Sequence, residues 1–534
     1  MVCCFKFQVK SALIILMLMC SSIVAYGHDA TIIVLNQQGF DRIDEAICDA
    51  AKAGKKDILV KVRCGSYLFH ENHLTLKGLP SDVSVAVKGK KVKVYAGGRK
   101  VGLNDVINLN NVYYQGKKYA IVDNWTEVKQ CDRLIEVVDS TTKLCRLELM
   151  NGDVATKGDV IQTSQWYMTC KYTISDYRDG YVYFTADNLK YVSWGKQWNV
   201  NYDYAYCKEM PRYRIWRTKN AKNGIYQGEA MRFMSLRNVN PKSLTIEGIT
   251  FCGNSSISSG ALIQLSGVKS ESIRFRKCVF ENCHSTCIIL GSSTNISVEN
   301  CRFSENYTTC IYSGGGCENV NITDCLFENN SKGWSNTFCI NIKGKDFLVA
   351  RNTFRDFAYG AIGIGEHYGD KKTYVSGVVA DNEIYYTNTY YADYKKHTLM
   401  DSGAIYLWTQ NDNVVIRNNY IHDYIGIKDN RGIFCDDGAS NFAIIGNTIL
   451  RIANSYCVDS RLIKDQRPGA FTNNVNITIT DNTFDGDIRF EGRDENGNRC
   501  VYGRNTIKTT PGAKASERRI VRIKVIKEDK ILQQ

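Results

Sequence analysis

A four-residue phrase recurs along the second half of the chain, from about Ser243, at intervals of roughly 20 to 40 residues. In each copy a Cys or Asn is followed two residues later by a Phe or Ile. The Cys or Asn positions are Cys278, Cys301, Cys325, Asn352, Asn382, Asn419, Asn447 and Asn482; the apolar ones are Phe280, Phe303, Phe327, Phe354, Ile384, Ile421, Ile449 and Phe484. A repeat of this period indicates a solenoid in which each copy adds one coil.

Each copy also contains a second short run of β-forming residues that starts at a small residue, as at Ala361, Ala404, Gly432 and Cys457. Short β-rich runs separated by turn residues, without a helical period, exclude an α-helical solenoid. Parallel coils stack about 4.8 Å apart, so like residues lie over like. Inward asparagines can then hydrogen-bond to one another while the phenylalanines stack.

These stacked columns resemble those of the pectate-lyase-like superfamily of right-handed parallel β-helices, over about residues 243–506. The resemblance implies an all-β fold, a right-handed parallel β-helix. Upstream, residues 39–53 have the pattern of an amphipathic helix and 57–67 that of an apolar strand ending in Gly-x-Tyr. This order resembles the N-terminal cap of such proteins, where the helix would cover the open end of the core.

The chain divides into five predicted segments. They are a signal peptide (1–27), an N-terminal cap with the first coils (28–100), an inserted β-rich domain full of Tyr and Trp (101–240), the parallel β-helix (241–506) and a basic C-terminal tail (507–534). The signal is indicated by Lys6 and Lys10 before an apolar run that is too short to cross a bilayer. We therefore expect a secreted, periplasmic or cell-surface protein without a transmembrane segment; lipidation at Cys20 is left open.

Charge and cysteine content narrow the expected partners and chemistry. The net charge of +13 would attract an acidic polysaccharide. An exported chain is not expected to bind nucleic acid, and we expect a monomer. Seven cysteines fall in the two inward columns, where a small apolar side chain fits. We expect mostly buried thiols there, although neighbouring coils bring Cα atoms within disulfide range.

Outward side chains of successive coils form ladders along the flank of a β-helix, where a polysaccharide can lie parallel to the axis. Aligning the second strands places Asp436 beside Trp408 and Arg461, and Asp459 one coil later beside Phe434. The Cα atoms of Asp436 and Asp459 would lie roughly 8 Å apart. Two carboxylates at such a separation can flank a glycosidic bond, one protonating the leaving oxygen and the other attacking the anomeric carbon or activating water.

The full set of candidates lies on the same flank. The candidate catalytic carboxylates are Asp436, Asp459, Asp437 and Glu366, and the candidate substrate-binding residues are Trp408, Tyr406, Phe434, Arg461, His367, Asp401 and Arg431. Asp436-Asp437-Gly438 also fits an ordinary turn at the end of a strand. Two adjacent aspartates beside a tryptophan nevertheless favour a functional interpretation.

The segment Asp436-Asp437-Gly438, with Asp459 on the next coil, resembles the acid-bearing strands of β-helix glycoside hydrolases, and most of all β-xylosidases with an inserted β-domain. The resemblance implies that Asp436 is the nucleophile and Asp459 the acid/base. The second residue of that pattern is Glu rather than Asp, and Arg461 lies nearby. Glu366 is therefore the substitute for the acid/base.

Two other functions remain open at the same flank. A polysaccharide lyase would remove the proton next to a uronate carboxylate, with Arg461, Lys464 or Arg431 as base. In that case Asp436, Asp437 and Glu366 could hold Ca²⁺, whereas the hydrolase needs no cofactor. The third function is a non-catalytic carbohydrate-binding or surface-structural β-helix. We take glycoside hydrolase as the first hypothesis.

Overall fold

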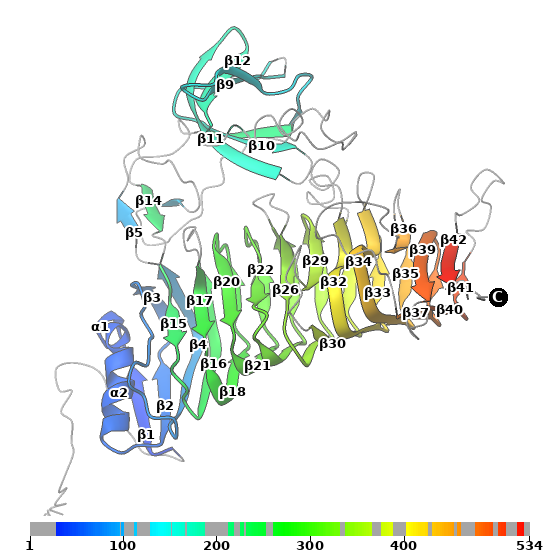
Figure 1. The fold of residues 1–534 in the computed structure, drawn as a ribbon. Helices are drawn as coiled ribbons and strands as arrows, with labels where there is room; N and C mark the ends of the chain where they lie inside the picture. Colours follow the sequence, from blue (N-terminus) through cyan, green and yellow to red (C-terminus); the bar gives the residue numbers. More distant parts are fainter. Residues whose placement is uncertain are drawn as a thin grey trace, which may run out of the picture.

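The fold is known from a computed structural model of the 534-residue chain. It describes residues 28–96, 98–100, 112–114, 126, 129–150, 152–165, 168–186, 189, 212–217, 225–228, 231–252, 260–331, 337–365, 375–387, 402–424, 430–452, 456–460, 476–494, 500–508 and 521–527. Figure 1 shows a long stack of coils that runs from α1 and α2 at one end to β41 and β42 at the other. Neighbouring coils pair in parallel throughout this stack, as the repeat predicted.

The pairings sort the strands of the stack into three faces. The first face consists of β1 (Ala30–Val34), β2 (Asp57–Val62), the start of β4 (Ser84–Ala96), the start of β16 (Ser243–Cys252), β18 (Lys269–Arg276), β21 (Thr294–Glu299), β24 (Glu318–Thr323), β27 (Phe347–Ala350), β30 (Ser376–Ala380), the ends of β32 (Ser402–Arg417) and β34 (Asn430–Ile445), β37 (Ile477–Thr480) and β40 (Val501–Gly503).

The second face carries the phrase found in the sequence. It consists of β3 (Gly65–Phe69), the ends of β4 and β16, β19 (Val279–Glu281), β22 (Arg302–Ser304), β25 (Leu326–Asn330), β28 (Thr353–Phe357), β31 (Glu383–Tyr385), β33 (Tyr420–His422), β35 (Thr448–Leu450), β38 (Thr483–Phe484) and β41 (Thr506–Ile507).

The third face carries the second strand of each copy. It consists of β15 (Met234–Arg237), β17 (Ala261–Ser266), β20 (Thr286–Gly291), β23 (Ile311–Ser313), β26 (Phe338–Ile342), β29 (Gly360–Gly365), the starts of β32 and β34, β36 (Tyr456–Ser460), β39 (Asp487–Asp494) and β42 (Val521–Lys527). Because β42 pairs with β39, part of the predicted basic tail belongs to the coils.

The predicted aromatic column is present inside the coils and begins one coil earlier, at Phe251. Rings of Phe251, Phe280, Phe303, Phe327 and Phe354 stack with centroids 4.6–5.0 Å apart, and all five are buried. The aliphatic members of the column continue the same register. Offset stacking at this spacing adds to the hydrophobic gain from burial, which holds each coil on the next.

The predicted asparagine column is a ladder of side-chain amides. Each Nδ2 donates to the Oδ1 of the next coil at 2.9–3.0 Å, through Asn352, Asn382, Asn419, Asn447, Asn482 and finally Asn505. The cysteine half of the column joins this ladder where the backbone N of Cys325 donates to Asn352 Oδ1. The cysteines of the described residues are all free and most are buried, as expected.

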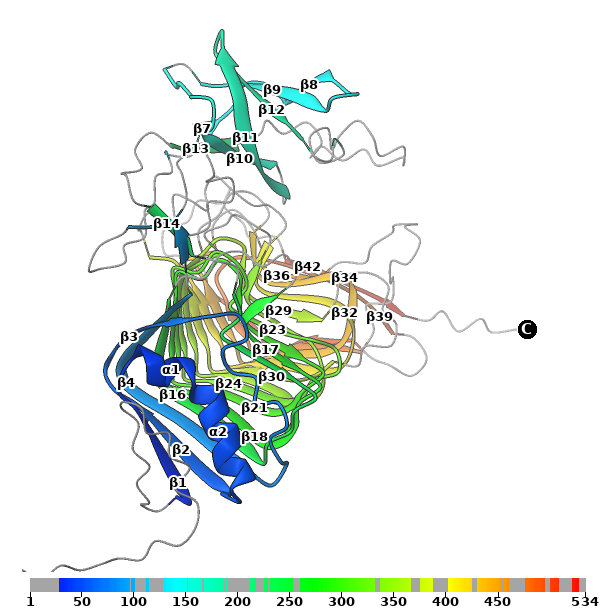
Figure 2. The same cartoon turned by 90° about the vertical axis from the view of Figure 1, so that its left-hand side faces the viewer.

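The predicted single helix over 39–53 is divided into α1 (Gln37–Asp41) and α2 (Ile43–Lys52), with Arg42 between them. The Asn36 side chain caps α1 by accepting from Gly39 N, so the helical segment begins before residue 39. Figure 2 looks along the coils and shows both helices across the near end of the stack. Their buried side chains, Phe40, Ile43 and Ile47, join the main core and cover its open end, as predicted.

The described parts of residues 98–228 form two antiparallel sheets outside the coils (Figure 1). One contains β5 (Gly98–Lys100), β6 (Val112–Tyr114) and β14 (Ile225–Gly228). The other contains β7 (Lys129–Gln130), β8 (Glu136–Asp139), β9 (Leu144–Glu148), β10 (Val160–Gln165), β11 (Met168–Arg178), β12 (Tyr181–Thr185) and β13 (Arg212–Trp216). The seven-stranded sheet has a core of its own, which includes Phe184, Tyr213 and Ile215.

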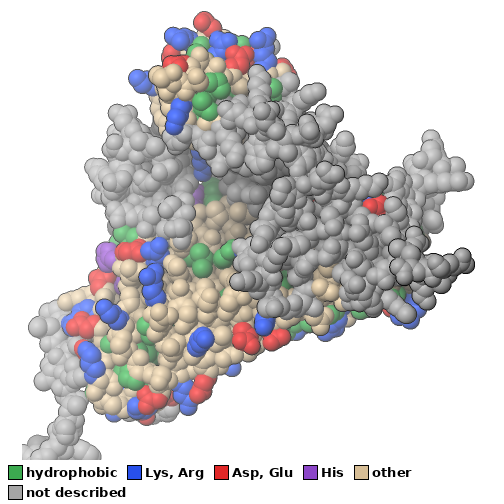
Figure 3. All heavy atoms as spheres, in the orientation of Figure 1, with side chains coloured by type: hydrophobic (Ala, Val, Ile, Leu, Met, Phe, Trp, Pro, Cys, Tyr) green, Lys and Arg blue, Asp and Glu red, His purple; other side chains and the backbone are tan. Residues whose placement is uncertain are grey.

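The surface of the described part carries basic and acidic side chains side by side, as Figure 3 shows on one side of the molecule. No helix among the described residues is long and apolar enough to span a membrane.

The aromatic column gives a direct test of the fold. Phe327→Ala should lower the free energy of unfolding by about 3–5 kcal/mol, because it leaves a cavity in a continuous stack. Asn419→Ala should cost about 1–3 kcal/mol, because it leaves its ladder neighbours without partners. Denaturant titration of both variants measures the two losses. Unchanged midpoints for both would contradict the register of the coils.

Candidate functional site

The predicted site residues whose side chains the structure describes are Tyr406, Arg431, Phe434, Asp436 and Asp459, which lie on the third face in β32, β34 and β36. Strand pairing places Phe434 over Asp459 and Trp408 over Asp436 on successive coils. This is the register predicted by aligning the small residues that start the strands. Asp436 and Asp459 therefore stand one coil and two residues apart, with Cα atoms at roughly 8 Å.

Four aromatic rings form a cluster on this flank, separate from the interior core: Phe338, Tyr359, Tyr406 and Phe434. The Tyr406 ring meets Phe434 edge to face at 4.7 Å and Phe338 at 5.6 Å. Gly363 makes this packing possible, because a Cβ there would lie 2.7 Å from Phe338 Cδ2. All four rings are buried, Phe434 completely, so they pack against one another as a wall behind the flank and not as an open surface for a sugar ring.

Asp436 lies at the edge of this cluster. Its side chain is buried, with an exposed fraction of 7%, and its Oδ2 accepts a hydrogen bond of 2.6 Å from the Tyr406 hydroxyl. The donor comes from the preceding coil, so the strand register itself holds the carboxylate in place. A carboxylate held in this way has the chemistry of a nucleophile or a base.

Asp459 has different surroundings, because two arginines bind its carboxylate. Arg431 Nε donates to Oδ2 at 3.0 Å, while Arg489 donates to Oδ1 through Nε at 2.6 Å and to Oδ2 through Nη2 at 2.7 Å. The Asp459 side chain is completely buried. Burial by itself lowers the pKa of Arg489, but the hydrogen bonds to Asp459 and the attraction to its charge raise that pKa above its usual value.

Each of the two arginines stacks its guanidinium group on an aromatic ring. The guanidinium of Arg431 lies 3.9 Å from the centroid of Phe434, and that of Arg489 lies 4.7 Å from the centroid of Tyr456. Stacking of this kind orients a guanidinium group and lowers the cost of removing it from water. The result is a rigid Arg431–Asp459–Arg489 triad with one net positive charge.

This triad argues against a proton-donor role for Asp459. Two guanidinium groups stabilise the ionised carboxylate, and both of its oxygens already accept charge-assisted hydrogen bonds. With both oxygens accepting from guanidinium groups, neither is placed to donate a proton to a leaving group. The geometry instead gives Asp459 the role of positioning Arg431 and Arg489, and the sequence analysis did not identify Arg489.

Comparison with known families agrees with the fold. Residues 218–377 and 263–512 match the family model described as the right handed beta helix region. Together these matches run from 218 to 512, more than half of the 534 residues. The chain belongs to the right-handed β-helix family. The predicted resemblance to right-handed parallel β-helices is thereby confirmed.

Three solved structures are similar to this chain. A glycoside hydrolase is 12% identical, with a TM-score of 0.57, over 85% of this chain and 96% of the other. The A-module of mannuronan C-5 epimerase from Azotobacter vinelandii is 11% identical over 95% and 96% of the two chains, with a TM-score of 0.43. A tailspike protein of E. coli bacteriophage HK620 is 10% identical over 86% and 66%, with a TM-score of 0.41. The first similarity shows a shared fold. No curated protein sequence matches the chain significantly.

The structure of this right-handed β-helix protein describes the remaining predicted site residues only in part or not at all. Glu366, His367, Asp401, Arg461 and the alternative base Lys464 fall outside the described residues. Trp408 and Asp437 lie in β32 and β34, where only their backbone is described. The calcium alternative named Asp436, Asp437 and Glu366 as ligands; among the described residues no group of three His, Cys, Asp or Glu side chains is arranged to hold a metal.

Proposed function

We propose that this chain is a secreted or cell-surface carbohydrate-active enzyme, a glycoside hydrolase that cleaves a polysaccharide or oligosaccharide on the third face. The observation that carries the proposal is the buried Asp436 carboxylate, held by the Tyr406 hydroxyl at the edge of an aromatic cluster. The parallel coils also present a long flank along which a polymer can extend. The shared fold with a glycoside hydrolase is consistent with this function but does not carry it.

In this proposal Asp436 attacks the anomeric carbon, or removes a proton from the water that attacks it. The glycosidic C–O bond breaks, and the leaving oxygen takes a proton from a second carboxylic acid. Glu366 is our candidate for that acid, because both oxygens of Asp459 already accept hydrogen bonds from arginines. Tyr406 positions Asp436, and the buried Phe434 ring packs edge to face against Tyr406 and holds it in place.

Arg431 is a poor candidate for the base of a polysaccharide lyase. A base must be able to accept a proton, whereas Arg431 is a buried guanidinium that donates to a carboxylate. The same two arginines would nevertheless suit a uronate carboxylate, since the triad carries one net positive charge. The lyase and the non-catalytic binding protein therefore remain as outcomes of the test.

Incubation with a panel of plant, bacterial and host polysaccharides tests the proposed function. New reducing ends without ultraviolet absorbance of unsaturated sugars would support a glycoside hydrolase. Reducing ends that carry the unsaturated chromophore would replace it with a lyase. Binding without any new reducing ends would indicate a non-catalytic carbohydrate-binding protein and would contradict the proposed enzymatic activity.

A further inference from the structure

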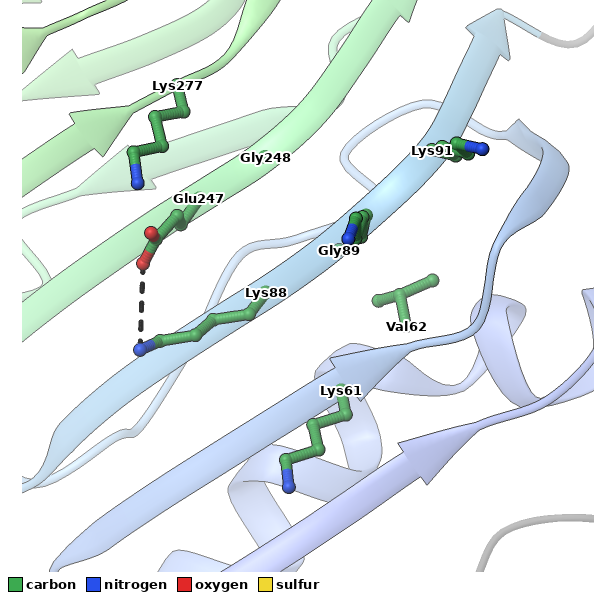
Figure 4. A pocket seen from close by; sticks show the side chains of 9 residues that line it. Lys61, Val62, Lys88, Gly89, Lys91, Glu247, Gly248 and Lys277 are labelled. Atoms are coloured by element: carbon green, nitrogen blue, oxygen red, sulfur yellow. Dashed lines mark ion pairs between the residues drawn. The ribbon is translucent and has the colours of Figure 1, made fainter.

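A basic pocket lies at the opposite end of the stack from Asp436, beside the N-terminal cap. Its volume is about 580 Å³, and it opens at the corner where β2, β4 and β16 turn from the first face towards the second. Its lining residues are Lys61, Val62, Lys88, Gly89, Lys90, Lys91, Glu247, Gly248 and Lys277. Figure 4 shows that these side chains come from neighbouring coils, with Lys88 turned towards Glu247.

An irregularity in strand pairing creates the pocket. Lys88 pairs with Glu247 and Val92 with Ile249, so the three residues 89–91 of β4 lie opposite Gly248 alone. Gly248 has φ +73, and a Cβ there would lie 2.1 Å from the carbonyl oxygen of Gly89. Only glycine can occupy this position, because any side chain would meet the Gly89 carbonyl.

The charge of the lining is strongly unbalanced, with five lysines against one glutamate. Lys88 lies 3.6 Å from Glu247, and within the described residues Lys61, Lys90, Lys91 and Lys277 form no ion pair. Lys61 and Lys88 are directly opposite each other on adjacent strands, an arrangement that destabilises a sheet through repulsion of like charges. A bound anion would relieve this repulsion.

We propose that this pocket binds the carboxylate or sulfate groups of an acidic polysaccharide, at a site separate from Asp436. Seven coil steps lead from β16 to β34, which places the two sites roughly 34 Å apart along the axis. Lysine ammonium groups act as mobile point charges, which suit repeated anionic substituents of a polymer. The choice of a glycan as the ligand rests on the proposed function.

The test compares two quadruple variants with equal loss of charge. The pocket variant carries Lys61→Gln, Lys90→Gln, Lys91→Gln and Lys277→Gln, and keeps the Lys88–Glu247 pair. The control carries Lys55→Gln, Lys77→Gln, Lys157→Gln and Lys269→Gln, at exposed lysines that do not line the pocket. Binding to polygalacturonate, heparin and neutral dextran is measured by titration at low and moderate salt, after thermal unfolding has shown that both variants fold.

The wild-type protein should bind at least one polyanion with an affinity that falls as salt rises, and should not bind dextran through this pocket. The pocket variant should bind that polyanion at least tenfold more weakly, and the control less than threefold more weakly. Binding to polygalacturonate but not to heparin would identify a carboxylate as the ligand group. Binding to heparin but not to polygalacturonate would identify a sulfate.

Three results would overturn the proposal. They are equal weakening in the two variants, absence of wild-type binding to both polyanions, and a pocket-dependent affinity for single-stranded DNA without one for the glycans. Cleavage of a neutral panel substrate should stay within twofold in the pocket variant. Failure of the pocket is therefore distinguishable from failure of the proposed function.

Discussion

Replacement of Asp459 by Asn should lower the free energy of unfolding by about 3–5 kcal/mol. The substitution removes the only negative charge of the Arg431–Asp459–Arg489 triad and leaves two guanidinium groups, one buried and one nearly so, facing a neutral amide. Burial of a charge without its counter-charge is among the most destabilising changes that one substitution can make. Denaturant titration of the purified variant measures the loss.

Asp481→Asn is the matched control. Arg504 binds Asp481 through two hydrogen bonds of 2.7 Å, as Arg489 binds Asp459, but both partners at this second site are exposed. Asp481 also has φ +61, a conformation that Asn adopts readily. The control should lose little stability, because water and salt screen an exposed ion pair. Equal losses at the two positions would contradict the structural role given to the triad.

The columns of the coil interior could be predicted from sequence, because each coil repeats the same chemical requirement. Phenylalanines over phenylalanines and amides over amides fix the register without any further information, and the structure confirms both columns. The division of the capping helix at Arg42 was not predicted. The apolar face of residues 39–53 continues through Arg42, and the only signal for the earlier start was the Asn36 cap.

The flank was harder to predict than the interior. Alternation along a strand says that Asp459 points outward, but it does not say what covers the side chain, and the carboxylate is completely buried. The sequence did not point to Arg489, because the alignment of the second strands ended at the coil that contains Asp459. Extending it by one coil would have placed Arg489 directly over Asp459, which is where the structure has it.

Asp436→Asn should lower kcat at least a hundredfold while substrate affinity survives. The carboxylate reacts with the anomeric carbon or with water in the transition state, so its loss should fall on the chemical step and not on the binding of the substrate. Asn has nearly the same shape, and its amide oxygen can still accept from Tyr406, so the fold should be retained. Asp346→Asn, at an exposed aspartate on the first face, is the control and should keep wild-type activity.

The central claim is that Asp436 carries out the cleavage of a glycosidic bond. The measurement that tests it most directly is the initial rate at which the Asp436→Asn variant releases reducing ends from a saturating polysaccharide that the wild-type protein cleaves. Our account predicts a rate at least a hundredfold below wild type, with circular dichroism and thermal unfolding unchanged. A folded variant that releases reducing ends at the wild-type rate would contradict it.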